Sequence, residues 1–315
     1  MKNYLENLDK EQLVLIKKIG DKADSLKKRA YIVGGVVRDI ILDKKSLDLD
    51  IAIVSDAIDF AKNISKIIKG RLVVYSKFKT ATLFLNNGAS IDFVMARKES
   101  YKTLGALPDV ELGSLRDDLF RRDFTINAIG ISINKNSFGN LIDEFKGVDD
   151  LKKKKIRVLH NKSFIDDPTR ILRAIRFEAR LGFQIENKTL KLLKQAIDKN
   201  APDTVTSARY FNEFRKMFKE DDPVKCLKRL RELGAEKFLG FRPRMCLRNV
   251  RQLHLRLKDI GGKNIGRSAM YMAALFKKLK IKTLEDNLEK FQITKKEKKI
   301  VLEWYKSDDI LNKLS

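Results

Sequence analysis

The sequence predicts an α+β protein, with a mixed sheet and helices in its N-terminal part and helices alone in the remainder. Short runs rich in β-branched and aromatic residues, typical of strands, are concentrated in roughly the first 145 residues. After Gly147 helical periodicity prevails and strand-like runs become rare. At 315 residues the chain also exceeds the usual size of one domain. We therefore expect a sheet-containing unit at residues 1–147, a helical unit at 148–200 and a second, basic helical unit at 201–315.

The N-terminal unit is expected to begin with an amphipathic helix at residues 5–28, in which Leu13, Ile16 and Ile19 mark one apolar face. The run AYIVGG that follows indicates a strand ended by a tight glycine turn. A further helix is expected at residues 56–69. The other strand-like runs lie at residues 47–54, 71–76, 80–86 and 90–96.

The helical part has clear start and stop signals. Asp167 is a good N-cap, and Pro168 suits the first position of the helix that follows. Proline-containing breaks at residues 200–203, 221–223 and 240–243 are expected to separate later helices. No internal repeat is evident.

The charge of the chain is strongly positive, with a net charge of +25 and a pI of about 9.9. Between Arg242 and Lys299 there are 17 Lys and Arg residues against 5 Asp and Glu residues. A general lysine-rich bias would also solubilise the surface, but a surplus this local favours a track for a phosphate backbone. Composition therefore favours a nucleic-acid partner.

Cysteine, histidine and hydropathy exclude several other classes. Cys226 and Cys246 are too few for a disulfide framework or a zinc site, and we expect buried thiols in a reducing compartment. His160 and His254 are too few for a histidine metal cluster. No apolar run is long enough to span a membrane, and the N-terminus has no signal-peptide core. We expect a cytoplasmic protein that does not act at a membrane.

Two carboxylates stand one residue apart in the strand-like run at residues 47–54. Asp48 and Asp50 should point to the same face, since side chains alternate along a strand. Two carboxylates without a nearby His or Cys form a hard-ligand site suited to Mg²⁺. Asp92, on another expected strand, would add a third ligand and allow two cations to act on a hydroxyl and a polyphosphate. The alternative is an exposed acidic turn.

Possible phosphate contacts lie on both sides of this pair in the sequence. Gly34 and Gly35 would let backbone N–H groups approach phosphate oxygens, and Arg38 would add a cationic fork. The run LFRRDFTINAIGI contains arginines that would hold a triphosphate and polar groups that would meet a ribose: Arg121, Arg122, Asp123 and Asn127. The alternative for Arg-Arg-Asp is a surface salt bridge.

A third constellation is the run DDPTRILRAIRFEAR. On a helix, four arginines fall within about a third of the circumference: Arg170, Arg173, Arg176 and Arg180. Ile171, Leu172 and Ile175 face away from them, towards a core. Arginines that begin at a helix N-terminus capped by Asp167 form an anion site. The alternative is an exposed basic face paired with Glu178 or other acids.

Taken together and in this order, GGVVRD with DLD, RRDFTINA and DDPTRILRAIRF closely resemble the class II tRNA nucleotidyltransferases and bacterial poly(A) polymerases. This family belongs to the DNA polymerase β-like nucleotidyltransferases. The resemblance covers about residues 29 to 185 well and the rest loosely. It implies a nucleotidyltransferase head at residues 1–147, a helical neck for base recognition at 148–200 and a tRNA-binding helical body at 201–315.

The resemblance also implies roles for individual residues. Asp48 and Asp50 match the Mg²⁺ ligands, and Asp92 matches the third catalytic carboxylate near the primer 3′-hydroxyl. The positions that match nucleotide-binding residues of the family are Gly35, Arg38, Arg122, Asp123, Asn127, Asp167, Arg170, Arg173 and Arg176. The Glu-Asp-x-x-Arg motif begins here with Asp166, while its base-reading pair Asp167 and Arg170 is intact. A carboxylate accepts from an exocyclic amine and a guanidinium donates to the ring edge, so this pair would select C and A without a nucleic-acid template.

The segment ARKESYKTLGALPDVE resembles the flexible loop of the family, with Arg97 and Glu99 as its basic-acidic pair. In the family this loop accompanies addition of the terminal A, which favours a CCA-adding or A-adding enzyme over a CC-adding one. The chain ends at Ser315, which is early for the family, so a reduced tail is expected.

The main hypothesis is therefore an Mg²⁺-dependent tRNA nucleotidyltransferase that uses ATP, and also CTP if it adds the whole CCA. Its expected partner is the acceptor end of tRNA with the adjoining stem. The alternatives are a poly(A) polymerase that acts on other RNA and a non-catalytic RNA-binding relative. The three retained carboxylates argue against the non-catalytic reading.

Overall fold

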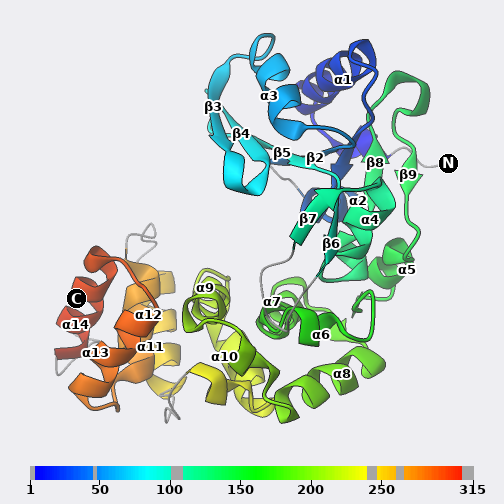
Figure 1. Ribbon diagram of the computed structural model, residues 1–315. Helices are drawn as coiled ribbons and strands as arrows, with labels where there is room; N and C mark the ends of the chain where they lie inside the picture. The colour runs from blue at the N-terminus through cyan, green and yellow to red at the C-terminus, as the bar shows by residue number, and fades with distance from the viewer. Residues whose placement is uncertain (1–3, 45–47, 101–108, 240–246, 260–265, 307–315) are drawn as a thin grey trace. The chain divides into compact units, whose positions relative to one another are not determined.

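The computed structural model describes residues 4–44, 48–100, 109–239, 247–259 and 266–306 (Figure 1). Two compact units make up the chain, the first formed by described residues up to His160 and the second by those from Asn161. The first combines a sheet with helices and the second is mainly helical, so the predicted α+β class is confirmed. The finer division at residues 147 and 200 stays a prediction.

The first unit holds most of the strands of the described chain. In order, its elements are η1 (Tyr4–Asn7), α1 (Lys10–Ser25), β1 (Ala30–Val33), α2 (Gly35–Ile41), β2 (Leu49–Ile53), α3 (Ala57–Ser65), β3 (Gly70–Tyr75), η2 (Ser76–Phe78), β4 (Thr80–Leu85), β5 (Ser90–Met95), β6 (Arg97–Ser100), β7 (Asp109–Leu112), α4 (Leu115–Phe120), η3 (Thr125–Asn127), β8 (Gly130–Ser132), η4 (Lys135–Ser137), β9 (Leu141–Ile142), α5 (Gly147–Lys152) and β10 (Lys155–Ile156).

Seven of these strands form one mixed sheet in the order β3-β4-β5-β2-β1-β8-β9. β2 and β5 run parallel, and the other neighbouring strands run antiparallel. A parallel pair needs a crossover, which α3 and the β3–β4 hairpin provide between β2 and β5. This crossover places the two aspartate-bearing strands next to each other.

The two faces of the sheet have different roles. Ile51 and Phe93 are paired in register and fully buried, and the Phe93 ring meets Phe60 of α3 edge-on with centroids 5.8 Å apart. On the opposite face, Ala52 packs in a core cluster with Leu119 of α4. Since side chains alternate along a strand, Asp50 shares the face of Ala52. The carboxylates therefore lie on the α4 side of the sheet, away from α3.

The second unit is built from helices with one short strand. Its elements are α6 (Ser163–Asp166), α7 (Thr169–Leu181), β11 (Gln184–Ile185), α8 (Asn187–Asp198), η5 (Ala201–Thr204), α9 (Ser207–Met217), α10 (Pro223–Glu232), η6 (Ala235–Leu239), α11 (Leu247–Asp259), α12 (Arg267–Phe276), α13 (Ile281–Lys290) and α14 (Lys295–Lys306). Aromatic rings join these helices in the core, and the rings of Phe211 and Phe291 are stacked with centroids 3.9 Å apart.

Several expected boundaries differ from the structure. The helix expected at residues 5–28 is divided, because Asp9 caps α1 by accepting the Gln12 N–H at 2.8 Å. The segment expected as a flexible loop forms antiparallel strands at its described ends, where Arg97 pairs with Leu112 in register. Its charged residues hid the strand pattern. Residues 101–108, the break at 240–243 and Cys246 lie outside the described residues.

Two other predictions are confirmed, one on the proline breaks and one on the burial of Cys226. The proline breaks at residues 200–203 and 221–223 fall where α8 ends and α10 begins. Cys226 is a buried free thiol whose pKa burial raises to about 12. No helix among the described residues combines the length and the apolar character needed to cross a bilayer.

The Ile133 backbone passes close to Gly20 of α1, and this contact gives a test of the fold. A Cβ added at Gly20 would lie 2.0 Å from the carbonyl oxygen of Ile133. Gly→Ala inside a helix ordinarily stabilises by about 1 kcal/mol. We expect Gly20→Ala to have the opposite effect and lower the free energy of unfolding by about 2 kcal/mol, because backbone must move. Urea denaturation followed by circular dichroism measures this.

The matched control is Gly130→Ala. The nearest atom to a Cβ at this position, Leu115 Cδ2, is 3.6 Å away, which is an ordinary contact. Its effect should stay within about 1 kcal/mol. A stabilised Gly20→Ala protein would show that α1 does not pack against the Ile133 backbone as described.

Candidate active site

Three predicted carboxylates come from neighbouring positions of the first unit. Asp50 of β2 and Asp92 of β5 are direct partners in the parallel register. Asp48 lies just before β2, and its Oδ1 accepts hydrogen bonds from the Ser90 N–H at 3.0 Å and the Ser90 hydroxyl at 2.8 Å. Asp92 Oδ1 accepts a hydrogen bond from the Thr82 hydroxyl at 2.5 Å. The sheet thus brings Asp50 and Asp92 side by side and fixes Asp48 at its edge.

Asp50 is the electrostatic centre of the group. Burial raises the pKa of its carboxyl, Arg122 lowers it, and the charges of Asp92, Asp48 and Asp118 raise it further, to about 6. The ionised form of the Asp50 carboxyl is therefore destabilised near neutral pH, which costs free energy. Additional positive charge at this point would relieve that cost.

Arg122 supplies one such charge, and a glycine makes room for it. Gly34 has φ +81°, in the region that favours glycine. A Cβ at this position would lie 2.5 Å from Arg122 Nη1 and 3.4 Å from Asp50 Oδ2. The absence of a side chain at Gly34 therefore lets the guanidinium approach the Asp50 carboxylate.

A buried ion-pair network holds Arg122 from behind. Asp118 is fully buried and accepts from Arg122 Nη2 at 2.8 Å through Oδ2. Its other oxygen accepts from Arg121 Nε and Nη2 at 3.0 and 2.6 Å. Arg121 Nη1 in turn donates to Glu99 Oε1 at 3.1 Å, and Arg97 donates to the same oxygen. The predicted pair Arg97 and Glu99 is thus formed and is linked to Arg122.

A second chain of hydrogen bonds joins three other predicted residues. Arg38 is almost fully buried, and its Nη1 donates to Asn127 Oδ1 at 2.7 Å. Asn127 Nδ2 donates to Asp123 Oδ1 at 2.8 Å. The Arg38 fork is also held by Asp39 through two bonds of 2.9 Å. The closest atom to a Cβ placed on Gly35 would be Arg38 Nη2, at 3.4 Å, so these residues are adjacent.

The predicted base-reading residues lie at the start of α7 in the second unit. Asp167 has extended backbone, and its Oδ1 accepts from the Thr169 N–H at 3.2 Å and the Thr169 hydroxyl at 2.7 Å. It therefore orders the first helical turn, although α7 itself begins at Thr169. Arg170 is buried and donates to the Ser163 hydroxyl at 2.6 Å. Arg209 Nη2 of α9 also lies 3.4 Å from Asp167 Oδ1, so both predicted side chains are held by contacts within the second unit.

The arginine stripe of α7 is paired with acids from the α9 region. Arg176 Nη1 donates to Glu220 Oε1 at 2.9 Å, and Arg173 Nη1 lies 3.7 Å from Glu213 Oε1. The stripe was expected as an open anion site, with acid pairing as the alternative. Pairing is observed, but it does not involve Glu178, which binds Arg229. Arg176 is also buried, whereas Arg180 at the end of the stripe is exposed and its Nε lies 4.0 Å from Glu220 Oε2.

Several residues that hold the site were not predicted from the sequence. Ser90 and Thr82 contact the carboxylates from the β4–β5 hairpin, and Asp118 contacts Arg121 and Arg122. Only Asp118 had a readable signal, because it precedes the two arginines by three and four residues in a helical pattern. The contacts from the hairpin depend on strand order.

The donor set suits a divalent cation without forming a closed metal centre. Among the residues that the structure describes, no three acidic, histidine or cysteine side chains converge as a ready-made metal site. Asp48 and Asp92 are each bound to a hydroxyl instead. Carboxylate oxygens nevertheless are the ligands that Mg²⁺ prefers, and like charges around Asp50 favour a cation.

The pKa of Asp50 gives a pH-dependent prediction. Because its folded pKa of about 6 exceeds the value of 3.8 for an ordinary Asp, its contribution to stability is full below pH 3.8 and is lost as pH rises through 6. Asp50→Asn should therefore raise the free energy of unfolding of the metal-free protein by about 2 kcal/mol at pH 7.5, and change it little near pH 4. Chemical denaturation in EDTA at both pH values measures the difference. An equal effect at both would contradict the assignment.

The buried Asp118 gives a second prediction. Asp118→Asn removes a charge that faces two arginines, so we expect it to lower the free energy of unfolding by about 3 kcal/mol. The matched control is Glu144→Gln, which removes the partner of Arg116 in an exposed pair with side chains 66% and 44% exposed. That pair should contribute less than about 1 kcal/mol. Similar losses in the two variants, measured by thermal and urea denaturation, would show that burial does not set the strength of the network.

Comparison with known proteins connects this geometry with one family. Residues 30–157 match the family described as "Poly A polymerase head domain", and residues 182–240 match "Probable RNA and SrmB- binding site of polymerase A". All the predicted carboxylates lie inside the first match. The base-reading residues fall between the two matches.

Curated relatives carry names from the same group. An A-adding tRNA nucleotidyltransferase of Geobacter sulfurreducens is 41% identical over 74% of this chain and 26% of its own length. An A-adding tRNA nucleotidyltransferase of Halalkalibacterium halodurans is 40% identical over 72% of this chain and 53% of its own length. The chain thus spans about half or less of the length of these relatives.

Solved structures extend the similarity over the whole described fold. The CCA-adding enzyme of Thermotoga maritima in complex with tRNA aligns with a TM-score of 0.79 and 33% identity, over 99% of this chain and 73% of that one. At this identity and coverage the likeness concerns sequence as well as fold. With its paired aspartates, its matched head region and these relatives, the chain belongs to the family of class II tRNA nucleotidyltransferases and bacterial poly(A) polymerases.

Proposed function

We propose that the chain is a template-independent tRNA nucleotidyltransferase that adds the 3′-terminal A, or the whole CCA, to tRNA. It would use ATP, and CTP for the longer product, and release pyrophosphate. The observation that carries the proposal is the in-register pair of Asp50 and Asp92 beside Arg122, inside the region that matches the poly(A) polymerase head. A tRNA substrate would place this activity in the cytoplasm.

The reaction assigns separate tasks to the three carboxylates. Asp48 and Asp50 would hold Mg²⁺, which when bound supplies positive charge to the reacting phosphate and the leaving pyrophosphate. Asp92 would orient the 3′-hydroxyl of the RNA for attack on the α-phosphorus. A new P–O bond then forms at the α-phosphorus while the bond to the β-phosphate oxygen breaks, and the hydroxyl proton passes to a carboxylate or to water.

Arginines would bind the triphosphate. Arg122 is held next to Asp50 by the fully buried Asp118, and its Nε is buried without a hydrogen-bond partner among the described residues. A phosphate oxygen would supply that partner and counter its charge. Arg38 is held rigidly by Asn127 and Asp39, which suits a role in supporting the phosphate-facing turn at Gly34 and Gly35.

Asp167 and Arg170 would read the base. An Asp carboxylate accepts from the exocyclic amine of adenine or cytosine, and a guanidinium donates to the ring nitrogen or carbonyl. Guanine and uracil present a carbonyl where A and C present the amine, so they would be rejected. The contact of Arg170 with Ser163 and of Asp167 with Thr169 supports a fixed orientation for both groups.

Two features support terminal A addition rather than CC addition. The relatives from Geobacter sulfurreducens and Halalkalibacterium halodurans are both named as A-adding. The Arg97–Glu99 pair that marks the loop of A-adding members is also formed, with bonds of 3.0 and 2.7 Å. We therefore place A addition first and complete CCA addition second.

One assay tests the proposal and separates its alternatives. The substrates are tRNA transcripts that end before CCA, after C and after CC, each with labelled ATP, labelled CTP or both. We expect incorporation of A onto the CC-ended tRNA, and loss of at least 1,000-fold in Asp48→Ala because the cation loses a ligand. Asp149→Ala, an exposed Asp in α5, is the matched control and should retain full activity.

The pattern of products decides between the activities. Incorporation onto all three tRNAs with both nucleotides indicates CCA addition. Long A tracts on unrelated RNA indicate a poly(A) polymerase instead. Equal incorporation by the wild type and Asp48→Ala would contradict the catalytic role of the carboxylates, and no incorporation by either would favour a non-catalytic RNA-binding protein.

A further inference from the structure

Two hydroxyl groups of one hairpin hold the two outer carboxylates of the site. The Ser90 hydroxyl donates to Asp48 Oδ1 at 2.8 Å, and the Ser90 N–H donates to the same oxygen at 3.0 Å. Thr82 donates to Asp92 Oδ1 at 2.5 Å. Thr82 lies on β4 and Ser90 begins β5, so both contacts originate from the β4–β5 hairpin.

The turn of the hairpin fixes the position of Ser90. Leu85 N–H donates to the Ala89 carbonyl at 2.9 Å, and Asn87 Oδ1 accepts from the Ala89 N–H at 3.1 Å. Gly88 has φ +86°, as such a tight turn requires. The residue that follows this turn is therefore presented to Asp48 by a backbone that is ordered independently of any substrate.

The contact with Ser90 orients Asp48, whereas the strand ladder fixes the backbone of Asp50. The parallel register between β2 and β5 begins with Leu49 and Ile91, so Asp48 lies outside the ladder. Its orientation is therefore not set by strand pairing. Asp50 and Asp92, in contrast, have backbones fixed by the ladder, but they face each other with like charge. Without a donor on Asp92, its carboxylate is expected to turn away from Asp50.

We propose that Ser90 and Thr82 are positioning residues, which orient Asp48 for cation binding and Asp92 for the 3′-hydroxyl of the RNA. This inference rests on the proposed function. Neither hydroxyl touches the reacting atoms; each acts through the carboxylate that it binds. Hydrogen bonds to ionised carboxylates are stronger than neutral ones, and partners that orient metal ligands typically change metal affinity or activity by about 10- to 100-fold.

The two residues should affect different steps. Asp48 is a proposed cation ligand, so loss of the Ser90 hydroxyl should weaken cation binding. The backbone N–H bond to Asp48 persists in Ser90→Ala, so we expect the lower end of the range, about tenfold. Asp92 is proposed to orient the hydroxyl of the RNA, so loss of the Thr82 hydroxyl should lower kcat and leave nucleotide KM and cation affinity nearly unchanged.

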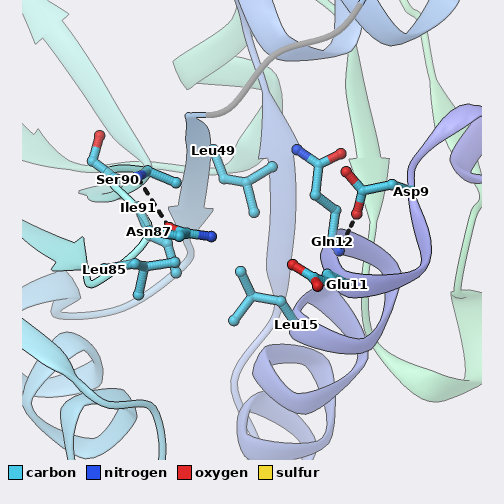
Figure 2. A pocket seen from close by; sticks show the side chains of 10 residues that line it. Asp9, Glu11, Gln12, Leu15, Leu49, Leu85, Asn87, Ser90 and Ile91 are labelled. Atoms are coloured by element: carbon cyan, nitrogen blue, oxygen red, sulfur yellow. Dashed lines mark hydrogen bonds between the residues drawn. The ribbon is translucent and has the colours of Figure 1, made fainter.

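A pocket beside Ser90 allows a conservative replacement. Figure 2 shows Ser90, Leu49 and Ile91 on the strand side of this pocket, opposite Gln12 and Leu15 of α1. Its volume is about 260 Å³. Ser90 lines this pocket, and Ser90→Thr keeps its hydroxyl. Thr82→Ser keeps the other hydroxyl and removes a methyl group.

The experiment uses the full chain and two readouts. Mn²⁺ binding is titrated by electron paramagnetic resonance of the free ion, with a non-hydrolysable ATP analogue present. Steady-state kcat and KM are measured for ATP with CC-ended tRNA and saturating Mg²⁺. The variants are Ser90→Ala, Ser90→Thr, Thr82→Val and Thr82→Ser. Matched controls are Ser55→Ala and Thr80→Val, since Thr80 is two residues from Thr82 on the same strand face and pairs with Val94.

The expected result is a split between the two positions. Ser90→Ala should raise the Mn²⁺ dissociation constant about tenfold, and Ser90→Thr should stay within about twofold of the wild type. Thr82→Val should lower kcat about tenfold at unchanged KM, and Thr82→Ser should restore it. Both controls should match the wild type. Melting temperatures, followed by circular dichroism, should be similar among all variants. A merely structural role would instead lower the melting temperature and leave the Mn²⁺ affinity unaltered.

Other outcomes overturn specific statements. Ser90→Ala and Thr82→Val proteins that behave like the controls, with an active wild type, overturn the positioning inference and leave the proposed function intact. If Ser90→Thr loses as much Mn²⁺ affinity as Ser90→Ala, or Thr82→Ser loses as much kcat as Thr82→Val, the inference is also overturned, because these variants keep the hydroxyl. A wild type that neither binds Mn²⁺ nor transfers nucleotide overturns the proposed function on which the inference rests.

Discussion

The parallel pairing of β2 with β5 is the constraint from which the site follows. It sets Asp50 directly beside Asp92, and two carboxylates at adjacent positions of neighbouring strands repel each other. Burial increases that cost, as the raised pKa of Asp50 shows. A fold that retains such an arrangement must supply positive charge and donors around it. The contacts of Arg122, Ser90 and Thr82 with the aspartates provide this positive charge and these donors.

Residues of alternating charge, beginning at the Asp50 carboxylate, offset the cost of burying its charge. Arg122 reaches Asp50 because Gly34 has no side chain, and Asp118 prevents Arg122 from turning towards solvent. Asp118 also binds Arg121 through its other oxygen, and Arg121 continues to Glu99. Each contact in this series helps to hold the side chain that precedes it. The three acidic and two basic side chains of this series leave one net negative charge, which a bound cation would offset.

Local patterns predicted the elements of the fold well, because they depend on neighbouring residues. Alternation placed Asp50 and Asp92 on strands, and both assignments agree with the structure. Strand order depends on pairing between distant segments, so the contacts of Ser90 and Thr82 with the aspartates were not predictable. The strand at Arg97 was missed for another reason. Charged side chains on an edge hairpin do not produce an apolar alternation.

The arginines of α7 show where sequence pattern and chemistry diverge. A stripe at helical spacing predicted an anion site, which stays a prediction, and in the structure Arg173 and Arg176 face Glu213 and Glu220. A carboxylate partner neutralises much of the long-range attraction of an arginine, but it fixes the guanidinium in one orientation. Such arginines are suited to recognition at short range and not to capture of a polyanion from a distance. If tRNA is the substrate, as proposed, we expect the lysine-rich helices towards the C-terminus, such as α14, to attract it, because several of their lysines are exposed and pair with acids only at the surface. Under the proposed function, recognition and attraction would be carried by different groups of basic residues within one helical unit.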